Sequence, residues 1–559
     1  MENLWLKVCC CILLLLVLSP GQSADTVWVQ RLLAEAPGGG RCHSRGKGIT
    51  LDGQGNIYIG GDGGVGWAYG LLLKYSTRGD FIWGTWLLGY NEYMYFNAMD
   101  YNPVDNTIAI AGSEWDASSN PDHALRTYKR DANGNPLWRA RYREIYGFAT
   151  DVVMDDSGNV YVVGSSSYDF LQRNAIIIRY ESEGTGGVGI ETWQDQYWGS
   201  SQAMAFVNSF SSVACDNEGY IYAAGSCVDQ GTRYNFVTIK YNPQNGSRVW
   251  LKKYEGSNDD YGENIAIDNA NYIYVSGESR SLGTGYSGIL VIKYNSNGDT
   301  VWTGKYDISG YNFTVKKTKV DRTGNVYIAG DVSHSRAIDA FIAKFSANGQ
   351  FEWIRYYNGP GNNTDQAEGI ALDNAGNIYI TGWAAVPLVG NDDYDYFTLK
   401  CNPQGDIIWT VLYDGPGTTY MADQAWDIVV DDSGYVYVTG ESDGGDLSGG
   451  TSDCTTIKYR QSGPHIFENS GDVVGCAYSI GQNPFKDATE ISFTLNQPSQ
   501  VAIKLYDCLG KYVKEVVNSK FPCGRHQVRL NAGDLSGGVY FLRLVTTEFL
   551  AKEKLIILK

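Results

Sequence analysis

The sequence is poor in the features on which most enzymes, metalloproteins and membrane proteins depend. It has five histidines, and none lies in an HExxH pattern or beside a nucleophile elbow. Beyond residue 24, no stretch approaches about 20 unbroken apolar residues. Only 19% of the residues are charged, and the formal net charge of −18 repels nucleic acid. We therefore expect no nucleic-acid partner, no membrane span in the mature chain, no metal site and no cofactor. An enzyme is left open, but a protein without catalysis is favoured.

Cysteine is also sparse and irregularly spaced. Three of the eleven cysteines lie within the first eleven residues, which leaves Cys42, Cys215, Cys227, Cys401, Cys454, Cys476, Cys508 and Cys523. These eight form no CxxC pair, which argues against a zinc or redox site, and they are too few for a disulfide scaffold. Cys42 with Cys454 and Cys508 with Cys523 are conceivable disulfides, but sequence alone does not fix the connectivity.

The N-terminus has the pattern of an export signal. Lys7 precedes the apolar run VCCCILLLLVLSP, and the small residues of GQSA follow at 21–24. The run is short for a spanning helix, and small residues suit cleavage by signal peptidase near Ala24. Residues 1–24 are therefore predicted to be a signal peptide; the alternative is an uncleaved membrane anchor.

Glycine and tyrosine, in contrast, are abundant, at 67 and 41 residues. Both belong to an internal repeat: DDSGNVYVVG at 155–164 returns in variants such as DRTGNVYIAG at 321–330 and DNAGNIYITG at 373–382. Eight copies close at Gly61, Gly112, Gly164, Gly225, Gly277, Gly330, Gly382 and Gly440. A period of about 52 residues predicts one four-stranded blade of a β-propeller for each copy.

The copy around Asp373 illustrates the expected blade. Runs rich in Val, Ile, Tyr, Trp and Thr predict four strands, at 368–373, 377–382, 396–402 and 407–415. DNAGN connects the first two, where Asp can cap a turn and Gly can adopt a left-handed conformation. The repeated signature therefore predicts turn chemistry. The alternative, a calcium loop, lacks the alternating acidic ligands and the terminal Glu of an EF-hand.

A tryptophan marks the predicted fourth strand of seven copies, at Trp83, Trp138, Trp193, Trp250, Trp302, Trp353 and Trp409. No such strand follows the eighth copy, but TVWVQRLL at 26–33 supplies one at the other end of the chain. Closing the ring with this strand hides sheet edges that an open array would expose. The predicted fold is all-β: an eight-bladed β-propeller over residues 25–460, with the N-terminal strand completing the last blade.

These repeats resemble the bacterial SBBP β-propeller repeat, whose mark is an Asp–x–x–Gly–Asn–x–Tyr–Val–x–Gly hairpin followed by a Lys–Tyr strand. That strand appears as LLKY at 72–75, TIKY at 238–241, VIKY at 291–294 and TIKY at 456–459. The resemblance covers residues 25–460 and implies the fold, but it implies no catalytic residues. The family is commonly described as seven-bladed, whereas eight copies are present here.

A second module follows the repeats. Residues 461–475 are predicted to be a linker, and residues 476–559 contain short strands that predict a small immunoglobulin-like β-sandwich. NPF at 483–485, LSGGVYFLRL at 535–544 and the terminal KLIILK are similar to the C-terminal sorting domain of type IX secretion cargo. This resemblance implies that the type IX machinery exports the protein, which is then secreted or held at the outer-membrane cell surface. The alternative is a plain immunoglobulin-like stalk.

The long, dissimilar connections are expected on one face of the propeller, opposite the short turns, and variable loops on a rigid scaffold usually carry binding. Trp67, Trp115 and Trp383 lie in these connections, where an indole can stack on a sugar or anchor a protein partner. The alternative is that these rings pack between blades. Residues just before the innermost strands are expected to rim the central channel: Lys47, Asp151, Glu263, Lys316, Glu368, Trp426 and Asp427.

The predicted ligand-binding residues are Trp67, Trp115, Asp151, Glu263, Glu368, Trp383, Trp426 and Asp427, and no catalytic residue is assigned. The favoured function is a secreted or surface protein that binds a glycan or a protein through its loop face. One alternative is an exported polysaccharide hydrolase or lyase that uses carboxylates at the channel mouth, such as Glu263 with Glu368. Another is a passive structural or adhesive surface protein, in which the rim charges are merely solvated.

Overall fold

The computed structural model describes residues 24–32, 42–64, 69–87, 93–116, 122–142, 146–167, 173–198, 208–228, 233–256, 258–280, 285–334, 337–388, 391–415, 423–443, 451–461, 478–480, 485–495, 498–507, 512–533, 535–546 and 550–558. The predicted signal peptide up to residue 23 and the predicted linker after residue 461 lie outside these ranges. The chain divides into two compact units, residues 1–463 and 464–559. The regular structure of the described residues is all β, as predicted, and none of it is a helix able to cross a membrane.

Strands of the first unit follow one another in groups of four. The first four groups are β2 His43–Leu51, β3 Ile57–Gly64, β4 Tyr69–Tyr75, β5 Phe81–Trp86; β6 Tyr93–Asn102, β7 Thr107–Asp116, β8 Asp122–Asp131, β9 Pro136–Tyr142; β10 Tyr146–Met154, β11 Val160–Ser167, β12 Asn174–Tyr180, β13 Glu191–Tyr197; and β14 Ser209–Cys215, β15 Ile221–Val228, β16 Tyr234–Tyr241, β17 Arg248–Tyr254. Within each group, sequence neighbours pair antiparallel.

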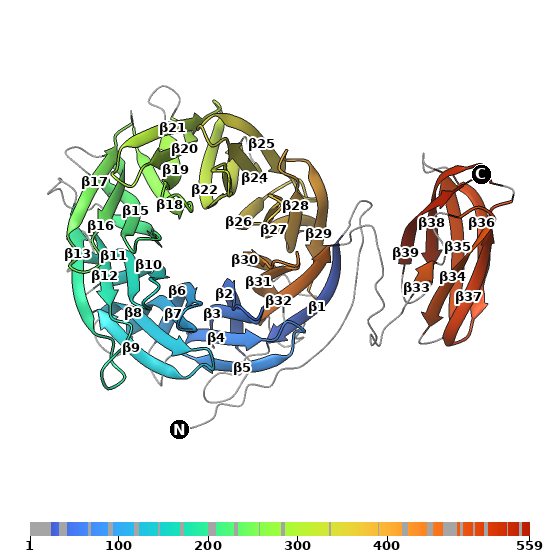
Figure 1. Cartoon of the computed structure of the whole chain (residues 1–559), viewed down its shortest axis with the longest axis horizontal. Helices are drawn as coiled ribbons and strands as arrows, with labels where there is room; N and C mark the ends of the chain where they lie inside the picture. The colour runs from blue at the N-terminus through green and yellow to red at the C-terminus, as the bar shows by residue number, and fades with distance from the viewer. Residues whose placement is uncertain are drawn as a thin grey trace. The chain divides into compact units, whose positions relative to one another are not determined.

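The remaining groups of the first unit repeat this order. They are β18 Asp260–Ile267, β19 Ile273–Arg280, β20 Ser287–Tyr294, β21 Thr300–Tyr306; β22 Tyr311–Val320, β23 Val326–His334, β24 Ala337–Phe345, β25 Phe351–Tyr357; β26 Asp365–Leu372, β27 Ile378–Leu388, β28 Asn391–Cys401, β29 Ile407–Tyr413; and β30 Gln424–Val430, β31 Val436–Asp443, β32 Ser452–Gln461 with β1 Ala24–Leu32. One parallel bridge between Tyr146 and His123 joins β6–β9 to β10–β13. The groups stand around a common centre, with the first strand of each group innermost (Figure 1).

The Asp–Gly signature forms the turn between the first two strands of a group, as predicted. At Asp373, Oδ1 accepts hydrogen bonds from the backbone N–H groups of Ala375 and Asn377, both at 2.9 Å. Oδ2 accepts from Asn377 Nδ2 at 2.7 Å and from the Tyr379 hydroxyl at 2.8 Å, and Gly376 has a φ of +79°. The carboxylate is thus engaged within its own turn, which supports the turn interpretation over a calcium loop.

Outer-strand tryptophans pack each group against the next. The Trp83 ring lies against Gly134 in the last turn of the following group, where a Cβ would come within 2.9 Å of the ring. Its Nε1 donates to the carbonyl oxygen of Ala132 at 3.2 Å. Equivalent ring-to-glycine contacts are Trp193–Gly246, Trp250–Gly298, Trp302–Gly349 and Trp353–Gly405. The repeated tryptophan therefore packs neighbouring groups against each other, because its ring lies on a glycine that has no side chain.

The N-terminal strand β1 pairs antiparallel with β32, from Ala24 opposite Gln461 to Leu32 opposite Cys454. The expected pairing of Trp28 with Lys458 is confirmed. Trp28 lies against Gly79 of the first group and donates to the carbonyl oxygen of Thr77 at 3.4 Å. Strand β1 thus supplies the contact that Trp83 and its equivalents make elsewhere.

One predicted loop is wrong. Residues 382–396 were expected to be irregular, but β27 and β28 continue through them as a long antiparallel hairpin that pairs as far as Leu388 and Asn391. Small and branched residues on one strand face acidic residues on the other: Ala384 lies opposite Asp395, and Val386 opposite Asp393. The length and the dissimilarity of this stretch suggested a loop, but both of its halves pair in register with each other and so continue the two strands.

The second unit consists of two antiparallel sheets. One contains β33 Tyr478–Ile480, β34 Ala488–Leu495 and β37 Gly524–Asn531; the other runs β36 Tyr512–Phe521, β35 Ser499–Asp507, β38 Gly538–Val545, β39 Leu550–Ile557. Ile491, Val501, Leu530 and Leu542, contributed by both sheets, are buried in one apolar core. Strand β36 was not expected, since its lysines mask its apolar alternation.

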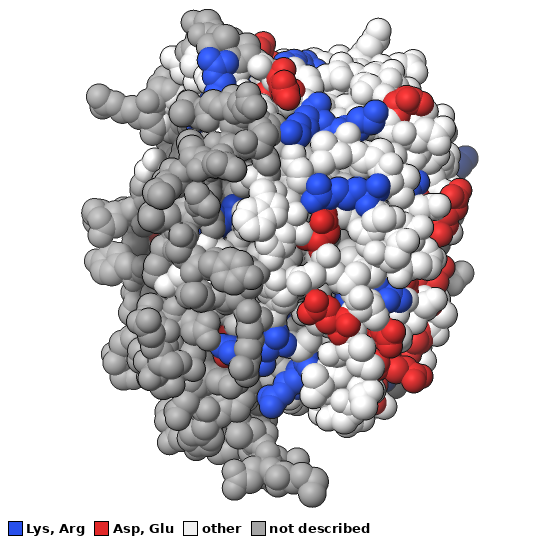
Figure 2. All heavy atoms as spheres, turned by 90° about the vertical axis from the view of Figure 1, so that its left-hand side faces the viewer, with Lys and Arg blue, Asp and Glu red and all other residues white. Residues whose placement is uncertain are grey.

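The outer wall of the first unit carries charges of both signs. Figure 2 shows Lys and Arg side chains interspersed with Asp and Glu on the side of β13 and β17. Arg248 of β17 pairs there with Asp195 of β13 at 2.7 Å. Mixed and paired charges of this kind are typical of a solvent-exposed protein surface.

A candidate binding site at the channel mouth

Each innermost strand of the first unit carries a β-bulge at the same place. In β18, Gly262 pairs with Gly277 and Asn264 with Ser276, so Glu263 is an extra residue without a partner in the ladder. The bulged residues of the eight groups are Lys47, Asn97, Thr150, Ser211, Glu263, Lys316, Glu368 and Trp426. A bulge re-aims a side chain away from the regular alternation of its strand.

The closing glycines of the repeat make room for these bulges. A Cβ on Gly277 would lie 1.8 Å from the carbonyl oxygen of Tyr261, two residues before the bulge. The equivalent separation is between 1.8 and 2.5 Å at all eight closing glycines. Since no side chain fits there, the glycine that defines the repeat is also what permits a bulged side chain at the channel.

Six of the bulged residues line one cavity of about 380 Å³: Lys47, Asn97, Thr150, Ser211, Glu263 and Lys316. Each bulge lies four or five residues before the end of its innermost strand, where the Asp–Gly turn follows. The bulged side chains are therefore set back from the Asp–Gly turns, around the middle of the innermost strands. Hydroxyl, amide, ammonium and carboxyl groups meet there, as in a site that recognises a polar ligand.

Two lysines on the ring are paired with carboxylates. Lys47 Nζ lies 2.8 Å from Asp62 Oδ2, and Lys316 Nζ lies 3.1 Å from Glu368 Oε1 and 3.6 Å from Asp331 Oδ2. Asp62 and Asp331 each follow a closing glycine, so a second ring of side chains accompanies the bulged one. Burial raises the pKa of Asp331 to about 7, Lys316 opposes this rise, and Glu368 adds to it.

Glu263 and Glu278 form a carboxyl-rich part of the mouth. Burial raises the pKa of Glu263 to about 7, and the charge of Glu278 raises it further, while Lys316 lowers it. Burial also raises the pKa of Glu278 to about 7, although this carboxylate accepts a hydrogen bond from the Val315 N–H at 2.8 Å. Near neutral pH, both side chains can therefore donate as well as accept hydrogen bonds.

Two of the four predicted tryptophans have described side chains. Trp383 follows Gly382 on β27, is half-buried, and makes an edge-to-face contact with Tyr394 at 4.8 Å between centroids. Trp426 is the bulged residue of β30, and its Nε1 is buried without a hydrogen-bond partner among the described residues. Trp67 and the side chain of Trp115 lie outside the described part of the chain.

Asp151 and Asp427 lie one residue beyond the bulge and hold adjacent strands together. Asp151 Oδ2 accepts from the Ser212 hydroxyl at 2.9 Å and from the Val213 N–H at 3.0 Å. Asp427 Oδ2 accepts from the Ile49 N–H at 3.1 Å, which ties the last group to the first. Both also border the cavity, where burial raises their pKa values and Lys317 lowers them. These contacts give both residues a structural part.

Sequence reasoning found Glu263, Glu368 and Trp426 but missed Asn97, Thr150 and Ser211. A signal for them was present: each bulged residue precedes its closing glycine by 14 positions, or by 15 at Asn97. The offset was not used, because the innermost strands were expected to begin after these residues rather than to contain them.

Comparison with known proteins bears on both units. Residues 482–558 match the secretion system C-terminal sorting domain. The second unit thus resembles a sorting domain over most of its length. A type IX sorting domain implies interaction with that secretion machinery, and the protein is secreted or held at the outer-membrane cell surface. In the first unit, residues 352–388 match the SBBP beta-propeller repeat, a stretch that contains Glu368 and Trp383.

Other similarities are remote. No curated protein matches the chain significantly by sequence. The beta-propeller domain of the Trilobed protease from Pyrococcus furiosus is 9% identical, with a TM-score of 0.39 over 64% of this chain and 93% of that one. A puromycin-hydrolyzing peptidase of Mycobacterium tuberculosis is 11% identical, with a TM-score of 0.37 over 81% and 58%. Similarities this low carry no conclusion about function.

Proposed function

We propose that residues 25–460 form an eight-bladed β-propeller closed by the N-terminal strand. A signal peptide at 1–24 precedes it, and a linker at 461–475 leads to an immunoglobulin-like sorting sandwich at 476–559. Eight groups of four strands support this proposal, as do the pairing of β1 with β32 and the hydrogen bond from Ile49 to Asp427. Closure removes the exposed edges that would otherwise make a surface protein aggregate.

The function that this geometry supports best is binding of a glycan at the channel mouth, by a protein exported to the cell surface or beyond. The carrying observation is the polar cavity that six of the eight bulged side chains line. The bulged indole of Trp426 precedes Asp427, which borders this cavity. Sugars present hydroxyl groups, which pair with carboxylates, amides and ammonium groups, and apolar C–H faces, which stack on indoles.

A glycan array tests this proposal, followed by calorimetry with the strongest hit. We expect Trp426→Ala and Trp383→Ala to weaken binding about thirty-fold, since truncating an anchoring tryptophan costs about 2 kcal/mol or more. Trp198→Ala is the matched control, because Trp198 ends an outer strand and is 56% exposed. Unchanged binding by both mouth variants contradicts the proposal, and capture of a protein instead of a glycan redirects it to a protein ligand.

The pKa of Glu263 favours hydrolysis as a second candidate. Cleavage of a glycosidic bond needs a protonated acid and an ionised carboxylate. Glu263 titrates near neutral pH, and Glu368 is paired with Lys316. Release of reducing ends from a polysaccharide, lost in Glu263→Gln and in Glu368→Gln, would establish this activity. If neither binding nor turnover is found, a passive structural component is the better description.

A further inference from the structure

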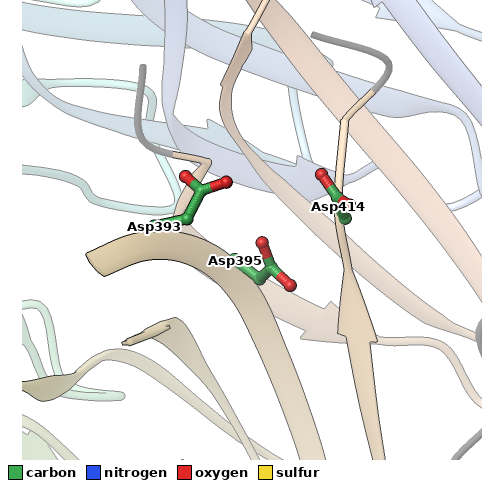
Figure 3. Close-up of side chains that lie close together, drawn as sticks. All are labelled: Asp393, Asp395 and Asp414. Atoms are coloured by element: carbon green, nitrogen blue, oxygen red, sulfur yellow. The ribbon is translucent and has the colours of Figure 1, made fainter. Parts of the chain in front are cut away.

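A cluster of three aspartates lies away from the channel, on the long hairpin and the strand beside it. Asp393 and Asp395 are two residues apart on β28, and Asp414 directly follows β29. One carboxylate oxygen from each lies within 4.8 Å of the others. Figure 3 shows the Asp395 carboxylate pointing into the gap between Asp393 and Asp414. Strand β28 and the end of β29 thus bring three carboxylate groups close together.

Asp395 is the informative member of the cluster. It is only 7% exposed, and its Oδ1 is buried without a hydrogen-bond partner among the described residues. The charged groups closest to it are all carboxylates: Asp414, Asp423 and Asp393. A buried, unsatisfied carboxylate among like charges is unfavourable unless a positive charge balances it.

The repeat itself supplies the comparison. Asp339, Asp395 and Asp453 occupy the same position in three successive groups, each opposite the second residue after the closing glycine. Asp339 Oδ2 lies 2.8 Å from His334 Nε2, and Asp453 Oδ2 lies 3.3 Å from Arg31 Nη2. Asp395 makes no ion pair with a basic side chain among the described residues, and its charged neighbours are the carboxylates of Asp393, Asp414 and Asp423.

The geometry suits a hard divalent cation. Three oxygens no more than 4.8 Å apart share a point at most about 2.8 Å from each, which admits the 2.3–2.6 Å of Ca²⁺–oxygen bonds. Ca²⁺ is favoured over Mg²⁺ because Mg²⁺ loses its waters reluctantly and is usually held by only one or two carboxylates. Asp423 contributes charge rather than a ligand atom, since its oxygens accept from the Gly415 N–H at 2.7 Å and the Asp443 N–H at 2.9 Å.

We propose that Asp393, Asp395 and Asp414 bind one Ca²⁺ ion, which joins the long hairpin of β27 and β28 to the end of β29. Water or backbone oxygens complete the coordination shell. This site differs from the Asp–Gly turns, whose carboxylates are engaged by their own turns. It does not depend on the proposed glycan site.

Calorimetry and thermal unfolding of the full mature chain test the site, with CaCl₂, MgCl₂ and EDTA. We expect one Ca²⁺ per chain, weaker binding of Mg²⁺, and a higher melting temperature with Ca²⁺ than with EDTA. Asp395→Asn and Asp414→Asn should each weaken Ca²⁺ binding at least about ten-fold, since each removes a charged ligand. Asp339→Asn, at the equivalent position beside His334, should bind Ca²⁺ as the wild type does.

Asp414 is exposed, so its variant reports on binding even if Asp395→Asn folds poorly. The proposal is overturned if the wild type shows neither heat nor a melting shift up to about 10 mM CaCl₂, ten times the weak limit of extracellular sites. It is equally overturned if both variants bind as the wild type, or if Mg²⁺ binds more tightly than Ca²⁺.

Discussion

Replacing a closing glycine by alanine should break the bulge that it permits. In Gly277→Ala, the new Cβ would start 1.8 Å from the Tyr261 carbonyl oxygen, whereas ordinary contact begins at 3.4 Å. The two strands must therefore separate by about 1.6 Å at this point. Overpacking of this kind costs about 1–3 kcal/mol, and the reduced freedom of the unfolded chain offsets about 0.4–1 kcal/mol. We expect a net loss of about 1.3 kcal/mol.

Urea unfolding followed by tryptophan fluorescence measures this loss as a lower midpoint at unchanged slope. Gly53→Ala is the matched control, because Gly53 lies in an Asp–Gly turn and its added Cβ would meet no atom within 4 Å. The control should unfold at the wild-type midpoint or slightly above it. Equal midpoints for the two variants would show that the bulge does not require glycine. The inference that the closing glycine of each repeat permits a bulged side chain at the channel would then be wrong.

Three further outcomes follow from the contacts described. Trp28→Ala should lower the free energy of unfolding by about 3 kcal/mol, as for other packed tryptophans, while Val27→Ala, at a 45% exposed neighbour, should change it little; urea midpoints compare them. Because burial raises the pKa of Glu263 from 4.5 to about 7, the folded protein binds more protons than the unfolded chain in that window. Stability therefore falls as pH rises from 4.5 to 7, and Glu263→Gln should flatten this fall in melting temperature. Asp373→Ala leaves turn N–H groups unpartnered and should cost about 1–3 kcal/mol by the same urea assay.

The repeat made much of the first unit predictable, because periodic glycines and tryptophans report contacts made many times. The pairing of Trp28 with Lys458 was predictable because the eight copies of the repeat have only seven fourth strands marked by tryptophan. The segment around Trp28 was therefore expected to supply the eighth. Sequence failed where a side chain's direction depends on a local irregularity. Asp151 borders the cavity as expected at the rim, but the sequence did not reveal that the bulge puts Thr150 at the extra position or that Asp151 also holds the next strand.

The aspartate cluster was beyond sequence reasoning for a different reason. Asp393 and Asp395 lay in a stretch interpreted as a loop, and Asp414 lies about twenty residues away. Only the continuation of β27 and β28 as a hairpin, and the pairing of Tyr396 with Tyr413, bring Asp395 and Asp414 side by side. Acidic residues are common in this chain, so composition alone gave no reason to select these three.

The position of β32 has a mechanical consequence. The chain leaves the first unit at Gln461, the last residue of a strand held between β31 on one flank and β1 on the other. A load pulling on the segment beyond Gln461 acts along β32 and must shear both ladders at once rather than peel a lone edge strand. A protein anchored through its C-terminal end can therefore resist drag at the cell surface without any added cross-link.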